Sequence, residues 1–516
     1  MIKHLQKTCF TTYIEPFFYE ICTSGKNKRE NIMVVENKAM QIRREIQKRI
    51  VNLIFNERLL DEIDRIPMAM RPRGSESFRC CVYRDRALIK QKIMAMLGFE
   101  VKNEDDELSP LSDFILQSYV KANSERDILH VVEDACHGCQ QNNYIVTNMC
   151  RGCEGRPCEV NCPKDAIDII GRRAVINPDK CVSCGICESV CPYHSIIYAP
   201  VPCEQACPVG AISKNENGKE IIDFDKCTFC GKCLTACPFG AIVEETHLFD
   251  LAFTLKRRKS LTALLAPSVA ASFDCSLPQI KNVLLQVGFE NVVFVAEGAE
   301  QTAAHEAKEF IEQGENLLTT SCCPSFVKII KKHVPELAEH VSSTPSPMVY
   351  AARTAKKRYP NAQTVFIGPC MAKKAESFNV SEVDMVINFE ELAALLLALD
   401  IDFVNINNEA SKIEAGTDAW GFAMSGGVLG AVKNKLPQGA NIKPLVINGI
   451  DKKAIKQLKL VKKQSQFNFI EGMSCEGGCL GGCYMNVKTV IAQKRMNKTI
   501  EAIKQSESQK IEISDI

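Results

Sequence analysis

The sequence has little of several features that mark common classes of protein. Aromatic residues make up only 7% of its 516 residues, and there is a single tryptophan. The formal net charge is +1 and no basic tract stands out, which argues against a nucleic-acid or anionic-membrane partner. No apolar run is long enough to span a bilayer. A G-x-G-x-x-G fingerprint between a strand and a helix is also missing, so no nucleotide site is predicted.

Cysteine is the residue in excess, with 27 copies. A disulfide-rich secreted protein is the first class to consider, but such chains are usually short and start with a signal peptide. Residues 1–28 have neither a continuous apolar core nor an A-x-A-like cleavage site. Cysteines at metal-ligand spacing in such a chain predict metal clusters and a reducing, cytoplasmic location.

Changes in composition and periodicity predict a multidomain α+β and α/β protein. The stretch after Met33 and the one from about 111 to 132 have helical periodicity, and the acidic stretch 102–110 between them reads as a loop. The adjacent Cys80 and Cys81 are poor joint ligands and are given a structural role. We predict an N-terminal extension at 1–32 (a misread upstream start is one explanation), a helical region at 33–130, a ferredoxin-like domain at 131–245, an α/β catalytic domain at 246–495 and a C-terminal tail at 496–516 that is loose from residue 505.

Two segments have the complete spacing Cys-x2-Cys-x2-Cys-x3-Cys-Pro of bacterial ferredoxins. In such runs the first three cysteines bind one 4Fe–4S cube and the fourth reaches the neighbouring cube. Zinc sites share Cys-x2-Cys but require neither the third cysteine nor Cys-Pro, so iron–sulfur clusters are favoured. The runs comprise Cys181, Cys184, Cys187 and Cys191, and Cys227, Cys230, Cys233 and Cys237.

Each run follows a second cysteine group, so the block is an internal repeat. The first group is complete, whereas the second keeps only its last two members and has Ser195 and Tyr198 where the other two would stand. Cys136 and Cys139, upstream at x2 spacing, are candidates for the missing pair. If this pair supplies the missing ligands, the crossed pattern gives four cubes. Otherwise three cubes form, and Cys136 and Cys139 are idle or chelate something else. The four sets are Cys150, Cys153, Cys158 and Cys191; Cys162, Cys181, Cys184 and Cys187; Cys207, Cys227, Cys230 and Cys233; and Cys136, Cys139, Cys203 and Cys237.

Three further cysteine motifs lie far apart after residue 243. They are Thr-Ser-Cys-Cys-Pro at 320–324, Gly-Pro-Cys-Met-Ala-Lys-Lys-Ala-Glu at 368–376, and Met-x-Cys-x3-Cys at 473–479. Taken singly, each cysteine could be a small packed residue. Two of the motifs follow predicted strands or precede helices, where an α/β sheet places its ligand-binding loops.

Together these motifs resemble the catalytic domain of FeFe hydrogenases over residues 245 to 490. The resemblance implies a 4Fe–4S cube joined through one cysteine to a two-iron unit that carries carbonyl and cyanide. Its implied cube ligands are Cys323, Cys370, Cys475 and Cys479, the last being the bridge. The cofactor pocket would be formed by Lys373 and Ser268 at the cyanides, Met473 beside the two irons, and Pro267, Ser346 and Pro369 in the wall.

The resemblance also implies a proton path. It would start at the Cys322 thiol and run through Glu306, Ser342 and Glu309. Because a helix is expected to open at residue 324, its dipole is expected to ease proton loss from Cys322. The family often has an arginine where Gln313 stands, so the outer end of the path departs from the pattern.

Other departures lie around the pocket. Gly368 stands where many members have methionine, and Phe326 where tryptophan is common. The segment after the last ligand reads Gly-Gly-Cys-Tyr-Met rather than Gly-Gly-Gly-Gln-Pro, which makes Cys483 an extra thiol near the cluster. These features indicate a divergent branch.

The resemblance implies an anaerobic, monomeric enzyme that interconverts protons, electrons and dihydrogen. Its accessory cubes would conduct electrons from ferredoxin, and maturation proteins would build the two-iron unit. Alternatives are a dihydrogen-sensing or electron-bifurcating component, a non-catalytic iron–sulfur assembly homologue, or a subunit that only relays electrons.

Overall fold

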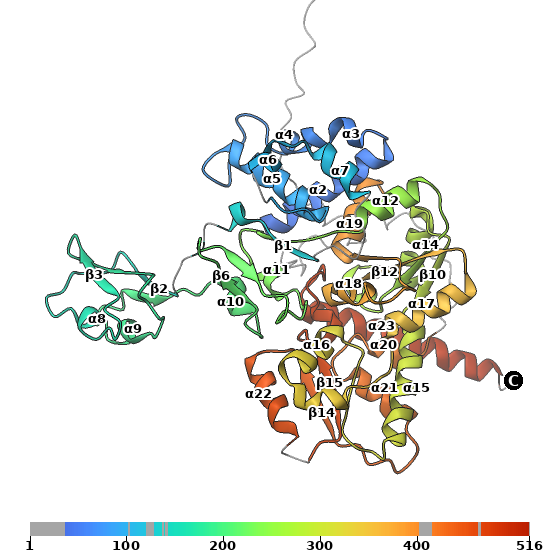
Figure 1. Ribbon diagram of the computed structural model, residues 1–516. Coiled ribbons are helices and arrows are strands. Elements are labelled where there is room, and N and C mark those ends of the chain that lie inside the picture. Colours follow the sequence, from blue (N-terminus) through green and yellow to red (C-terminus); the bar gives the residue numbers. More distant parts are fainter. Residues whose placement is uncertain are drawn as a thin grey trace, which may run out of the picture.

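The computed structural model describes residues 37–101, 104–119, 128–136, 139, 143–401, 415–462 and 466–514. The expected extension at 1–32 lies outside these residues. Figure 1 shows the N-terminal helices above a large mixed domain, with a small lobe projecting to one side. The predicted combination of a helical region, a ferredoxin-like region and an α/β domain is confirmed. Within the described ranges, no helix is both long and apolar enough to cross a membrane.

Short helices form the N-terminal region. The first begins at Lys38, where the Asn37 side chain caps it by accepting a hydrogen bond from the Met40 N–H at 2.9 Å. It ends at Phe55, before Glu57 turns the chain with a φ of 60°, so the helical structure expected after Met33 is confirmed in the described residues but is interrupted there. The helices are α2 Lys38–Phe55, α3 Leu59–Glu62, η1 Ile63–Arg65, α4 Ile66–Met70, α5 Val82–Met96, α6 Glu104–Leu108 and α7 Leu111–Ser118.

Two other local expectations for this region are wrong. The acidic stretch expected to be a loop contains α6, and the helix expected to reach residue 132 ends at Ser118. Residues 129–131 instead form β1 (Leu129–Val131), which pairs antiparallel with β8 (Ile242–Glu244). Local periodicity could not show this, because the partner strand lies more than a hundred residues further along the chain.

The ferredoxin-like region consists of two similar lobes. The outer lobe, residues 143–200, is the projecting one in Figure 1. Its first and last strands, β2 and β5, pair antiparallel, and the β3–β4 hairpin lies between them in the sequence. Its elements are β2 Tyr144–Val146, α8 Pro157–Val160, β3 Ile167–Ile170, β4 Arg173–Ile176, α9 Ile186–Ser189 and β5 Ile196–Tyr198.

The inner lobe has the same order of elements but is split in the sequence. Strand β1 opens it, and the rest resumes at residue 201, so the outer lobe is an insertion within the inner one. The two ends of the insertion meet, since the Ala199 N–H donates to the Asn143 carbonyl oxygen at 2.7 Å. The other elements are α10 Pro202–Ala206, β6 Ile212–Lys214, β7 Glu220–Ile222, α11 Lys232–Ala236 and β8.

Two parallel sheets form the scaffold of the large domain. The four-stranded sheet has the order β10-β9-β12-β13 and the three-stranded sheet the order β11-β15-β14. Every pairing in both sheets is parallel, so the strands' carboxyl ends gather at one edge of each sheet. The strands are β9 Leu261–Leu265, β10 Asn291–Phe294, β11 Leu318–Thr319, β12 Gln363–Gly368, β13 Met385–Asn388, β14 Pro444–Asn448 and β15 Phe469–Met473.

Helices surround these sheets. The sequence predicts apolar strands at 291–296, 364–367 and 384–388 and helices at 325–333 and 390–399, and these elements occur within two residues of those bounds. The expected loose tail is wrong: residues up to Ser514 belong to the last helix. The helices are α12 Leu248–Lys256, α13 Val269–Ser272, α14 Leu277–Val287, α15 Ala296–Glu312, α16 Pro324–His333, η4 Pro335–His340, α17 Pro347–Arg358, α18 Met371–Ser377, α19 Phe389–Ala398, α20 Thr417–Gly421, α21 Gly427–Lys435, α22 Lys452–Val461, η5 Gly478–Gly481 and α23 Thr489–Ser514.

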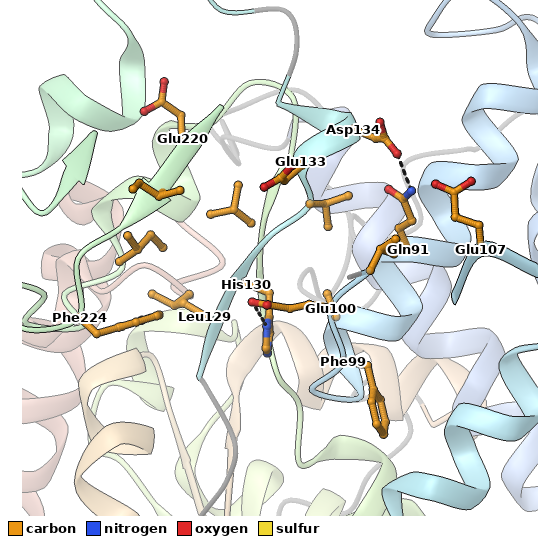
Figure 2. A pocket seen from close by; sticks show the side chains of 16 residues that line it. Gln91, Phe99, Glu100, Glu107, Leu129, His130, Glu133, Asp134, Glu220 and Phe224 are labelled. Atoms are coloured by element: carbon orange, nitrogen blue, oxygen red, sulfur yellow. Dashed lines mark hydrogen bonds and ion pairs between the residues drawn. The ribbon is translucent and has the colours of Figure 1, made fainter. Parts of the chain in front are cut away.

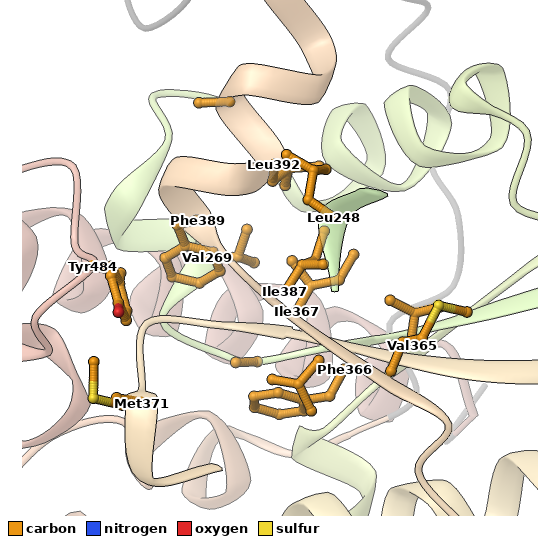
Figure 3. Packing of buried hydrophobic residues seen from close by; sticks show 14 of the residues in the cluster. Leu248, Val269, Val365, Phe366, Ile367, Met371, Ile387, Phe389, Leu392 and Tyr484 are labelled. Atoms are coloured by element: carbon orange, nitrogen blue, oxygen red, sulfur yellow. The ribbon is translucent and has the colours of Figure 1, made fainter. Parts of the chain in front are cut away.

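The core of the large domain surrounds β12. Figure 3 shows Ile367 beside Ile387 near Phe389, with the Phe366 ring on the other side of the strand. All five residues of β9, next to β12, are buried. Burial on both faces is typical of a parallel sheet covered by helices, and it fixes the strand ends from which the functional loops start.

Candidate active site and metal centres

A buried cavity of about 80 Å³ lies at the carboxyl ends of the parallel strands. It brings together loops that follow β9, β11, β12 and β15, although these strands belong to two different sheets. Most of the residues assigned to the cofactor pocket line it directly. These are Pro267, Ser268, Cys322, Cys323, Pro369, Cys370, Lys373, Met473 and Cys479.

The thiols assigned to the active cube lie close together. Burial raises the pKa of Cys370 to about 12, and the nearby thiolates of Cys323 and Cys479 contribute to this shift. Burial raises the pKa of Cys475 well above its ordinary value, and the charges of the other three thiolates add to the shift. Four mutually close, desolvated thiols form a donor set that fits a 4Fe–4S cluster, whose iron would offset their negative charge.

Lys373 supplies a buried positive charge beside these thiols. Its ammonium forms an ion pair with Glu376 at 2.8 Å, and only 12% of its side chain is exposed. Burial opposes the charge, but Glu376, Cys370 and Cys322 favour it and raise the pKa of Lys373 overall. A lysine held charged at the cavity wall fits an anionic cofactor ligand.

Two buried serine hydroxyls fit the same cofactor. Ser268 and Ser346 are at most 2% exposed, and neither Oγ has a hydrogen-bond partner among the described residues. Ser268 lines the cavity, and Ser346 directly precedes Pro347 and Met348, which also line it. Buried hydroxyls without partners are uncommon and mark places where a bound group can accept a hydrogen bond.

The Cys322 thiol lies between the cavity and the first assigned proton carrier. It lines the cavity and is 7% exposed, and Glu306 on α15 is close enough to raise its pKa. The sequence predicted that the dipole of α16 eases proton loss from Cys322, but other influences dominate its pKa. Burial is the largest influence and raises the pKa of Cys322 well above its ordinary value, because the charged thiolate is desolvated there.

Glu306 is fully buried, and burial raises its pKa to about 8. Its Oε1 accepts hydrogen bonds from the Ser321 N–H at 2.9 Å and the Ser321 hydroxyl at 3.2 Å. Its Oε2 has no partner among the described residues. Sequence reasoning missed Ser321, although it stands next to Cys322 in the motif.

Glu309 is the partner of Ser342. The Ser342 hydroxyl donates to Glu309 Oε2 at 2.5 Å. Ser343 donates to the other oxygen from its N–H at 3.0 Å and its hydroxyl at 3.1 Å, and the Thr344 hydroxyl donates to Oε2 at 3.2 Å. The outer acid is therefore fixed by three successive residues, of which the sequence indicated only Ser342.

The cavity wall at Gly368 is closed by a residue that sequence reasoning missed. A Cβ on Gly368 would lie 2.7 Å from ring atoms of Phe366, which lines the cavity. Residues 366 and 368 share one face of β12 because side chains alternate along a strand. The phenylalanine ring thus fills space that a side chain at Gly368 would take, and Figure 3 shows it lying beside the strand.

Cys483 lies between the active thiols and the inner lobe. It is partly buried, and desolvation raises its pKa, with the nearby charges of Cys370 and Cys475 adding to the shift. A Cβ on Gly231, in the loop between Cys230 and Cys233, would lie 2.5 Å from its Sγ. Cys230 in turn is close enough to raise the pKa of Cys475. The inner lobe therefore meets the active site at this thiol.

The two thiol sets of the outer lobe match the crossed pattern. In the first set, burial and the nearby charges of Cys191 and Cys153 raise the pKa of Cys158. Cys150 is also close to Cys191, since the charge of Cys191 acts on its pKa. The second set lines one small cavity. Its members are Cys162, Cys181, Cys184 and Cys187.

The inner lobe holds the other two sets. Cys207, Cys227, Cys230 and Cys233 line a common cavity. Burial raises the pKa of Cys203 to about 12, and Cys237, Cys139 and Cys136 contribute. The upstream pair therefore lies with Cys203 and Cys237, because β1 belongs to the inner lobe and the outer lobe is inserted after Cys139.

The structure also has a larger cavity of about 480 Å³ between the N-terminal helices and the inner lobe. Figure 2 shows acidic side chains, including Glu133, Asp134 and Glu220, spread around it rather than converging. None of its lining residues is a cysteine. It is thus separate from the chemistry that the thiols indicate.

Two family models match the chain. The model of the iron only hydrogenase large subunit, C-terminal domain, matches residues 259–483, and the 4Fe-4S binding domain matches residues 174–197 and 220–243. The first match contains all the strand ends that form the 80 Å³ cavity. The chain is an iron-only hydrogenase-like protein. Its ferredoxin-like segments bind iron–sulfur clusters.

Relatives of this hydrogenase-like protein are similar at modest identity. Iron hydrogenase 1 of Clostridium pasteurianum is 28% identical over 396 residues, covering 62% of this chain and 66% of the relative. The NADP-reducing hydrogenase subunit HndD of Solidesulfovibrio fructosivorans is 26% identical over 388 residues, covering 59% and 63%. The chain thus spans less than two thirds of the length of these relatives.

Two further similarities are more limited. The cytosolic Fe-S cluster assembly factor NAR1 of Kluyveromyces lactis is 32% identical over 121 residues, covering 23% of this chain and 26% of the relative. The solved structure of FeFe-hydrogenase HydA1 from Chlamydomonas reinhardtii is 20% identical, with a TM-score of 0.38, and the match covers 47% of this chain and 84% of that one.

Proposed function

We propose that this protein catalyses the reversible reduction of protons to dihydrogen. The observation that supports this best is the cavity at the strand ends, where the four assigned cube thiols meet a buried lysine, a buried proton carrier and hydroxyls without partners. An oxidoreductase needs such a site to hold a cluster and to move protons in a water-poor environment.

The proposed cofactor is a 4Fe–4S cube held by Cys323, Cys370, Cys475 and Cys479, with Cys479 bridging to a two-iron unit. When bound, that unit supplies the redox-active metal at which protons and electrons combine. The cavity residues would orient it: Lys373 by its charge, and Ser268 and Ser346 by donating hydrogen bonds, while Pro267 and Pro369 would shape the wall. Met473, 4% exposed, would exclude water.

The proposed proton path uses groups already in place. The Cys322 thiol would deliver or accept a proton at the cavity and exchange it with Glu306, which keeps an oxygen without a partner. Ser342 and Glu309 would carry it outward along their 2.5 Å hydrogen bond. The buried Glu306 would hold its proton readily, because its pKa is raised to about 8.

We propose that four accessory cubes supply the electrons. Their ligands would be the two outer-lobe sets and the two inner-lobe sets, and the contact between Cys230 and Cys475 would join the inner lobe to the active cube. Protein lacking the two-iron unit would then contain five cubes in total. An iron count of about 20 atoms per chain is expected, whereas three accessory cubes would give about 16.

Partners and location are part of the same proposal. A low-potential ferredoxin would deliver electrons, and maturation proteins would insert the two-iron unit. The enzyme would act as an anaerobic, cytoplasmic monomer. A component of an electron-bifurcating or sensing complex is the second candidate, favoured by the similarity to the HndD subunit.

The test is gas evolution from anaerobically matured protein with reduced viologen. Dihydrogen production is expected, and Cys322→Ala should abolish it while the infrared bands of the carbonyl and cyanide ligands remain. Cys80→Ala, at an exposed thiol outside the large domain, is the matched control and should keep full activity.

Two outcomes would contradict the proposal. A fully loaded two-iron site without gas evolution would point to a non-catalytic role, such as the assembly role named for NAR1. Full activity in Cys322→Ala would refute only the proton role of that thiol.

A further inference from the structure

Two cations from the N-terminal region lie against the thiol set Cys136, Cys139, Cys203 and Cys237. The Arg79 guanidinium donates to the carbonyl oxygens of Ala135 and Phe239, each at 3.3 Å. Ala135 precedes Cys136, and Phe239 follows Cys237 by two residues. Arg79 thus bridges the two chain segments that supply these thiols.

Lys92 on α5 approaches the same set from the helix side. Its side chain is buried, and its Nζ lies 3.1 Å from the position a Cβ on Gly240 would occupy. Lys92, Gly240 and Cys237 line one small cavity. Burial lowers the pKa of Lys92 to about 8 and also lowers the pKa of Arg79, while the charge of Cys237 favours the protonated form of both.

The nearby carboxylates do not cancel these charges. Glu220 on β7 faces Cys136 and Cys203, but its carboxylate forms an ion pair with Lys214. Asp85 accepts hydrogen bonds from the Ser77 hydroxyl and the Phe78 N–H and lies 3.8 Å from Arg71. Glu220 and Asp85 thus each have another cation nearby, and Arg79 and Lys92 are cations on which the charge of Cys237 acts.

We propose that Arg79 and Lys92 raise the reduction potential of the cube bound by this thiol set. Reduction adds one electron, delivered by ferredoxin or viologen, and so adds one negative charge to the cube. A buried cation stabilises the more negative state, because attraction is weakly screened away from water. The N-terminal region thereby stabilises the reduced form of this cube. The inference rests on the proposed fourth accessory cube, but not on dihydrogen turnover.

The test is a redox titration, followed by electron paramagnetic resonance, of the full chain with its 4Fe–4S clusters. Cys139→Ala identifies the signal of this cube. Lys92→Met should lower its reduction constant by at least about tenfold, which is about 59 mV for a one-electron couple. Glu220→Gln should shift it in the opposite direction, since it removes a negative charge and leaves Lys214. Lys90→Met is the control, because Lys90 on the same helix bonds to the Glu107 carbonyl instead.

Arg79 provides a second, independent variant pair. Arg79→Lys keeps the charge and should stay close to the wild-type potential, whereas Arg79→Gln should lower it. Unchanged potentials in both Lys92→Met and Arg79→Gln would overturn the proposal, as would a wild-type iron count that leaves no fourth cube. Failure of the hydrogenase function would appear only in the gas assay, so the two failures are distinguishable.

Discussion

The outer and inner ferredoxin-like lobes have the same cysteine pattern in different surroundings. In the outer lobe Cys184 is exposed and only Cys158 and Cys191 are buried, whereas in the inner lobe Cys136, Cys203, Cys207, Cys233 and Cys237 are buried. The outer lobe projects from the molecule, and the inner lobe packs against both the N-terminal helices and the active-site loops (Figure 1). Because burial and nearby charge set cluster potentials, one motif can serve two tasks: electron entry and delivery to the active site.

Excision of the outer lobe is the strongest test of this division. Replacing residues 144–198 by a short Gly-Ser linker should be tolerated, because Asn143 and Ala199 are already hydrogen-bonded. About eight iron atoms should be lost. Ferredoxin-driven gas evolution should fall by roughly 100-fold, because the clusters that would accept electrons from ferredoxin are missing. Viologen-driven activity should persist. Loss of the inner-lobe clusters as well would show that the two lobes do not fold as nested units.

Matched single-cysteine variants sharpen the same comparison. Cys230→Ala removes a ligand next to Cys475, so activity should fall roughly 10–100-fold with either electron donor. Cys184→Ala, at the exposed outer-lobe thiol, should impair the ferredoxin-driven rate and spare the viologen-driven one. Equal losses with viologen would mean that small donors also enter through the outer lobe.

Buried ion pairs between the N-terminal helices and the large domain should contribute more to the free energy of unfolding than ion pairs at the surface. Arg43 on α2 forms a buried ion pair with Glu390 on α19. Arg43→Met leaves that carboxylate buried and unpaired, which should lower the free energy of unfolding by about 3–5 kcal/mol. Arg49→Met breaks the partly exposed pair with Glu45 and should cost at most about 1 kcal/mol. Denaturant unfolding would measure both, and similar values for the two would contradict the structure.

The smallest expected difference between the two lobes is at a pair of glycines in equivalent positions. Gly185 in the outer lobe and Gly231 in the inner lobe both have positive φ, 83° and 78°. A Cβ would approach the flexible hydroxyl end of Tyr144 in the first case and the partly buried Cys483 thiol in the second. Both alanine variants should lose about 1–2 kcal/mol through backbone strain. Gly231→Ala should lose about 1–3 kcal/mol more by overpacking, and should also change the spectrum of the active cube. Equal thermal shifts would refute the difference in packing.

Sequence patterns predicted chemistry better than they predicted local structure. The strands near 291, 364 and 384 were predictable because buried parallel strands are short apolar runs. The break at Glu57, the helix at 104–108 and the helical C-terminal residues were not, since each depends on a local turn or on packing that periodicity does not report. Similarly, Ser321 and Phe366 gained roles only through neighbours distant in sequence.

The sequence by itself determined the number and spacing of the thiols, and with them the kind of cluster and the family. Ligand spacing of this kind is a local property, because residues two to four positions apart stay close in any compact loop. Only the tertiary structure decided where Cys136 and Cys139 belong, since their partners Cys203 and Cys237 become neighbours through the nested insertion. It also decided that the surplus thiol Cys483 meets Gly231, and that Arg79 and Lys92 reach one thiol set but not its repeat. These contacts join segments far apart in the chain, and chain folding rather than residue spacing creates them.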